Sequence, residues 1–173
     1  MALWGLMHLL SPLQIGKAQA AMTPSPETQT LRFKFVERKE GPGFTQDVYT
    51  RDGTSLSFIR TDLQVTPELI EEVFELDLQA VIEHVKPTQA PDIKVAREAE
   101  LKALSSTFLR MGFLTFESLE ANTVRLEMSG LATMEGRFVK LRYSDPSTDD
   151  PRMSSADAML FFRHLMSLAP KPN

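Results

Sequence analysis

The chain has 173 residues, no cysteine and a formal net charge of −4 at pH 7. The lack of cysteine excludes disulfides, thiol catalysis and cysteine-based zinc sites. The acidic balance disfavours bulk binding of nucleic acid, which favours basic domains. The length suits one domain whose core is large enough to fold without covalent staples.

The N-terminal segment is mostly apolar and carries no acidic side chain. It ends in Ala18-Gln19-Ala20, which has the small-x-small form that a signal peptidase accepts. Polar residues interrupt the apolar run, and a membrane-spanning helix needs about 20 apolar residues, so a span is disfavoured. We therefore predict an exported protein, periplasmic or extracellular; the alternative is a cytoplasmic protein that keeps this segment. The predicted division is a signal peptide over 1–20, a spacer over 21–30, one domain over 31–169 and a C-terminal tail over 170–173.

Three strands are predicted after the spacer. Residues 31–38 alternate between apolar and charged side chains, which is typical of a half-buried strand. Residues 44–51 and 54–60 form a hairpin closed by Asp52-Gly53, a pair that suits a type I′ turn. A two-residue turn places Arg51 opposite Thr54, Tyr49 opposite Leu56 and Asp47 opposite Phe58.

Two helices are predicted in the middle of the chain. The first begins at Thr66-Pro67, because threonine suits the N-cap and proline the first helical position, and it ends at Lys86-Pro87. Its apolar face comprises Ile70, Val73, Phe74, Leu78, Val81, Ile82 and Val85. The second is predicted over 91–111. Its apolar stripe comprises Ile93, Ala96, Leu104, Phe108 and Met111.

The last third predicts three more strands and a helix. The strands start at Phe113, Val124 and Arg137, with turns near Asn122 and at Glu135-Gly136. A polar loop over 145–153 leads into a helix over 154–168, with Ser154 and Asp157 as its capping box.

These elements predict an α+β fold: a single-domain sandwich with a largely antiparallel sheet of about six strands packed with about three helices. The order of the elements is loosely similar to that of small exported α/β/α sandwich domains of the PsbP and DcrB-like kind. This resemblance implies three layers and carries no implication for activity.

Residues with catalytic or ligand-binding chemistry are few. Asp157 and His164 lie seven apart on the last predicted helix, but no further histidine or cysteine is placed to complete a metal site. The segment from Asp145 resembles the start of a calcium loop, yet Asp150 and Ala156 stand where such a loop needs glycine and glutamate. We therefore predict no catalytic residue, no metal ligand and no cofactor.

A basic strand face is the one candidate binding feature. If the strands share a sheet, the basic side chains form a patch for an anionic partner such as a lipid head group, a glycan or an acidic protein surface. The patch would comprise Arg32, Lys34 and Arg38 of the first strand and Arg125, Lys140 and Arg142 of later strands. The ordinary alternative is a solvated face, partly neutralised by Glu127.

The sequence thus favours an exported, non-enzymatic binding or assembly domain whose basic face meets an envelope protein or another anionic ligand. An alternative is a small-molecule or lipid carrier with an apolar pocket between the helices and the sheet. That pocket would be lined by Phe74, Phe108, Phe161 and Phe162. A hydrolase without a recognisable motif is a further alternative.

Overall fold

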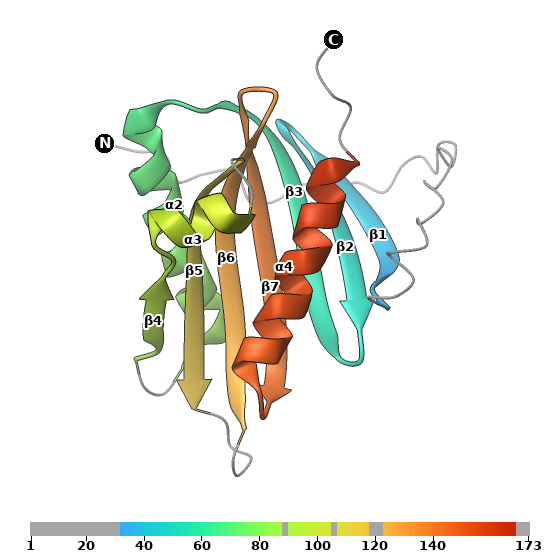
Figure 1. Ribbon diagram of the computed structural model, residues 1–173. Helices are drawn as coiled ribbons and strands as arrows, with labels where there is room; N and C mark the ends of the chain where they lie inside the picture. The colour runs from blue at the N-terminus through green and yellow to red at the C-terminus, as the bar shows by residue number, and fades with distance from the viewer. Residues whose placement is uncertain (1–31, 88–89, 105–106, 118–122, 169–173) are drawn as a thin grey trace.

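The computed structural model describes residues 32–87, 90–104, 107–117 and 123–168. These residues form a seven-stranded antiparallel sheet and three helices, which confirms the α+β prediction with one strand more than expected (Figure 1). The strands are β1 (Lys34–Gly41), β2 (Phe44–Arg51), β3 (Thr54–Gln64), β4 (Asp92–Val95), β5 (Phe108–Glu117), β6 (Val124–Met134) and β7 (Arg137–Thr148). The helices are α2 (Pro67–Val85), α3 (Glu98–Leu104) and α4 (Pro151–Ser167). The order of the strands across the sheet is β1-β2-β3-β7-β6-β5-β4.

The hairpin register follows the sequence prediction pair by pair. Arg51 lies opposite Thr54, Tyr49 opposite Leu56 and Asp47 opposite Phe58. Asp52 and Gly53 have φ angles of 47° and 84°, as a type I′ turn requires. The two-residue turn therefore fixes which side chains of β2 and β3 share a face.

The helix predicted over 91–111 is wrong. The chain instead forms the edge strand β4, the short helix α3 and the first part of β5. In β4, Ile93 and Val95 alternate with charged residues, and the strand pairs with the segment of β5 from Gly112 to Thr115. Pairing with β5 thus outweighs the helical spacing of the apolar residues, which is the usual way in which tertiary contacts override a weak local pattern.

The start of the last helix also differs from the prediction. Asp150 is the N-cap, and its Oδ1 accepts hydrogen bonds of 3.1 Å from the backbone N–H groups of Arg152 and Met153. Ser154 lies one turn inside the helix and is buried. The polar loop is correspondingly shorter than predicted, because β7 continues to Thr148.

The helices cover the sheet from both sides, so the fold has three layers. The α3 and α4 helices pack on one face, where Phe161 and Phe162 are fully buried in the larger core. The α2 helix packs on the other face against β5 and β6, with Phe74 buried against Leu131 and Phe138. Figure 1 shows α4 in front of the sheet and α2 behind it.

The α2 helix covers only part of the sheet face on which it packs. Within the described ranges, no helix packs on that side of β1, β2 or β3. We call the α2-side surface of β1, β2, β3 and β7 the open face. By register, the open face comprises Lys34, Glu37, Lys39, Phe44, Gln46, Val48, Thr50, Ser55, Ser57, Ile59, Thr61, Lys140, Arg142 and Ser144.

The predicted signal peptide and spacer lie outside the described residues. The helices that the structure does describe include none long and apolar enough to cross a membrane.

Candidate functional site

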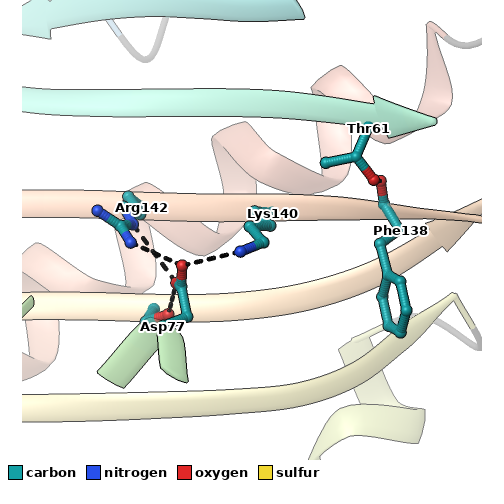
Figure 2. Close-up of polar contacts among 6 residues, drawn as sticks. Thr61, Asp77, Phe138, Lys140 and Arg142 are labelled. Atoms are coloured by element: carbon teal, nitrogen blue, oxygen red, sulfur yellow. Dashed lines mark hydrogen bonds and ion pairs between the residues drawn. The ribbon is translucent and has the colours of Figure 1, made fainter. Parts of the chain in front are cut away.

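A buried carboxylate stands at the border between α2 and the open face. Asp77 points from α2 to the sheet, and only 1% of its side chain is exposed. Arg142 Nη2 donates to Asp77 Oδ1 at 2.6 Å, and Lys140 Nζ lies 3.4 Å from the same oxygen (Figure 2). The hydroxyl of Ser129 donates to Asp77 Oδ2. One carboxylate is therefore shared by two cations of β7 and one hydroxyl of β6.

The surroundings of Asp77 keep it ionised. Burial by itself raises the pKa of Asp77, because the charged form loses its hydration. The hydrogen bond and charge of Arg142, together with Ser129 and Lys140, outweigh the burial and leave the pKa below its ordinary value. Asp77 is thus a permanent anion at neutral pH, and it holds two basic side chains in place.

A second cluster of polar side chains lies on β6 and β7, next to the residues that contact Asp77. Arg125 Nε donates to Glu127 Oε1 at 2.7 Å, and the hydroxyl of Ser144 donates to the same oxygen at 2.7 Å. Ser144 pairs with Glu127 across β7 and β6, next to the pair of Arg142 and Ser129. Here one cation meets one carboxylate, so this group adds hydrogen-bonding capacity without net charge.

The six basic residues singled out in the sequence divide between different places. Arg125, Lys140 and Arg142 share the α2 side of the sheet, and Lys34 reaches the same side because it lies opposite Thr50. The expected common face of the first strand does not form. A register shift between Phe35 and Glu37 interrupts the alternation of β1, as a β-bulge does.

Arg38 and Arg32 both lie away from the open face. Arg38 lies opposite Asp47 on the α4 side, where it donates two hydrogen bonds of 2.6 and 3.0 Å to that buried carboxylate. Arg60 donates a third to Asp47, at 2.8 Å. Arg32 precedes β1 and lines a polar cavity near the start of α4.

The four phenylalanines considered for an apolar pocket also lie apart. Phe74 lies on α2 and packs against the sheet, whereas Phe108, Phe161 and Phe162 belong to the core on the α4 side. All four rings are buried in close packing, with at most 6% of each residue exposed. The sheet separates Phe74 from the other three, so the four do not line one cavity.

Asp77 is the central residue that sequence reasoning missed. The apolar face predicted for this helix does not include it. The signal was present in the spacing, because Asp77 lies four residues after Val73 and four before Val81, both of which are buried. An acidic residue within a buried helical stripe indicates a buried partner of opposite charge.

The described part of the chain holds no group of three histidine, cysteine, aspartate or glutamate side chains that could bind a metal. Comparison with protein-family models, curated proteins and solved structures gives no match. The class is therefore defined by the fold alone: an α+β protein with helices on both sides of one antiparallel sheet.

Proposed function

We propose that this protein is an exported, non-enzymatic binding domain whose open face docks an acidic surface of a partner protein. One observation carries the proposal: Lys140 and Arg142 share a single buried carboxylate. The pair of cations has one charge more than Asp77 neutralises.

The excess positive charge is on the solvent side of this group of residues. The Asp77 side chain is almost fully covered, whereas 27% of the Lys140 side chain and 36% of the Arg142 side chain are exposed. A group that approaches the open face meets the cations and not the carboxylate. Local potentials of this kind steer anionic partners even when the net charge of the protein is negative.

The shape of the open face suits a protein surface. Its side chains between β1 and β7 are mostly short and polar, with Val48 and Ile59 among them. Gln46 Nε2 donates to Ser57 Oγ at 3.0 Å, so these two polar groups hold each other in place. Short side chains allow close approach, and mixed polar and apolar groups are typical of non-obligate interfaces.

Buried hydroxyls at this site support binding over catalysis. Ser129 is fully buried and donates to Asp77, so its hydroxyl is not presented to a substrate. Asp77 and Ser129 would thus position the cations, and Lys140 and Arg142 would contact the partner.

Photo-crosslinking in the source cell tests the proposal. A crosslinking amino acid at Ser57 is expected to capture a protein with an acidic surface, and Leu160, an exposed position on the α4 side, serves as control. Lys140→Glu and raised salt should both remove the Ser57 product. The matched variant Lys94→Glu, at an exposed lysine of β4, should leave it unchanged. The same product from Leu160, or a Ser57 product that survives Lys140→Glu, would contradict the proposal.

Export is tested separately, by the intact mass and N-terminal sequence of the native protein in each cell fraction. We expect a chain that begins at Ala21 outside the cytoplasm, as a cleaved leader would leave. A cytoplasmic chain that retains residues 1–20 would refute export. It would not affect the docking proposal, which the crosslinking experiment tests separately.

A further inference from the structure

A polar cavity lies on the opposite side of the sheet from the open face. It is formed where the β2–β3 turn, the end of β7 and the beginning of α4 meet, and its volume is about 450 Å³. This volume lies within the range of about 300–1,000 Å³ that small-molecule sites occupy. Its charged lining residues are Arg32, Arg51, Asp52, Asp145 and Asp157.

Asp145 is the buried carboxyl group of this cavity. The residue is 8% exposed, and its carboxylate accepts hydrogen bonds from Ser154 Oγ at 2.5 Å and from the Ser147 backbone N–H at 3.3 Å. The hydroxyl of Tyr143 lies 2.8 Å from Ser154 Oγ and extends this buried chain. Among the described residues no lysine or arginine forms an ion pair with Asp145. A buried carboxylate fixed by neutral donors is a suitable partner for the cationic group of a ligand.

Arg51 is a fixed cation in the wall of the same cavity. Its Nη1 donates to Asp157 Oδ2 at 2.8 Å, and its guanidinium lies 4.6 Å from the centre of the Phe33 ring. The ion pair and the ring contact restrict its rotamers and hold the guanidinium in the wall of the cavity.

Arg32 brings the second guanidinium to the cavity in an unusual backbone conformation. Its φ angle is 57°, in the left-handed region that residues with a β-carbon seldom adopt. Backbone strain of this kind concentrates at ligand-binding segments. With Arg32 and Arg51 on the wall and Asp145 buried, the cavity presents both signs of charge.

We propose that this cavity binds a small zwitterion, such as a free α-amino acid, with its ammonium group at Asp145 and its carboxylate at Arg32 and Arg51. The mixed lining favours a zwitterion over a plain anion, because a plain anion would meet three aspartates. The polar lining also favours a small hydrophilic solute over a lipid.

Titration of the full chain by nuclear magnetic resonance tests this site. Glycine, L-alanine and L-glutamine serve as zwitterionic probes, and acetate and methylammonium carry each charge alone. We expect saturable shifts around Ser147 and Thr54 with at least one zwitterion, and at least tenfold weaker binding of the two single-charge probes. Shifts that do not saturate with any amino acid, or acetate binding as tight as that of the amino acids, would overturn the proposal.

Two variants separate binding from folding. Asp145→Asn keeps the shape of the side chain and should weaken amino-acid binding at least tenfold. Arg32→Gly removes a guanidinium and relieves the left-handed backbone, so it should also weaken binding tenfold without loss of thermal stability. Asp62→Asn, at an exposed carboxylate paired with Arg137, is the control and should bind like the parent. Unchanged affinity in Arg32→Gly would overturn the proposal even if Asp145→Asn does not fold.

Discussion

Arg142 on β7 donates a hydrogen bond of 2.6 Å to Asp77 on α2, a carboxylate that is almost completely buried. This bond joins the helical layer to the strand at which the open face begins. Lys140 shares the same carboxylate, so Asp77 both anchors α2 and fixes the two cations that the proposed function uses.

Replacing Asp77 by asparagine should lower the free energy of unfolding by about 2 kcal/mol. Loss of one partner from a buried ion pair costs about 3–5 kcal/mol, and the partial exposure of Lys140 and Arg142 reduces this effect. Urea denaturation measures the change. The exposed pair of Asp62 and Arg137 offers a matched control, because Asp62→Asn should cost less than about 0.5 kcal/mol. Equal losses in the two variants would show that burial of Asp77 has no special importance.

The contribution of Asp77 should also depend on pH in one direction. Its pKa is lower in the folded protein than in the unfolded chain, so its stabilising effect is present above the unfolded pKa and is lost as pH falls through the folded pKa. Between pH 7 and 5 the stability gap between the parent and Asp77→Asn should therefore stay constant. Below about pH 4 the gap should shrink, since an unperturbed aspartate titrates there. A gap that widens on acidification contradicts the direction of the shift.

Gly112 on β5 allows α2 to pack closely on the sheet. A β-carbon at this position would lie 2.8 Å from Leu78 Cδ2 and 3.2 Å from Phe74 Cζ. Gly112→Ala should therefore cost about 1–2 kcal/mol through overpacking. In a Leu78→Ala background the same change should cost less, because the obstructing methyl group is gone. Additive losses in thermal denaturation of the two single variants and the double variant would exclude this contact as the cause.

Neighbouring residues of α4 should differ sharply in their effect on stability. Phe162 is fully buried in the core on the α4 side, whereas Leu160 is 51% exposed. Phe162→Ala should cost about 3–5 kcal/mol, as large-to-small changes in a core do. Leu160→Ala should stay within about 0.5 kcal/mol, as substitutions at the surface do. Calorimetric melting of both variants checks the orientation of α4, and a greater loss in the leucine variant would contradict it.

Much of the fold was predictable because local signals were strong. The Asp52-Gly53 turn determined the register of β2 and β3, and Thr66-Pro67 marked the start of α2 correctly. The region around β4 was mispredicted because its short strand is stabilised by pairing with β5, a contact that periodicity does not contain.

The candidate site was predictable only in part, for a related reason. Outward-facing Lys140 and Arg142 could be recognised from the alternation along one strand. Asp77 joins them from another element, so their shared carboxylate depends on how α2 lies across the sheet. The separation of Arg38 from Lys34 depends on a bulge in β1, which the alternation of residues 31–38 did not reveal.

The most direct measurement is a titration of the isolated protein with a hexaglutamate peptide, followed residue by residue in amide spectra. We expect the shifts to concentrate at Ser57, Ile59, Lys140 and Arg142 and to disappear in Lys140→Glu, while Lys94→Glu retains them. Shifts centred on basic residues elsewhere, such as Lys102 or Arg152, would contradict the claim that the open face binds an acidic partner. The same conclusion would follow if the open face did not respond at low salt, where attraction between opposite charges is strongest.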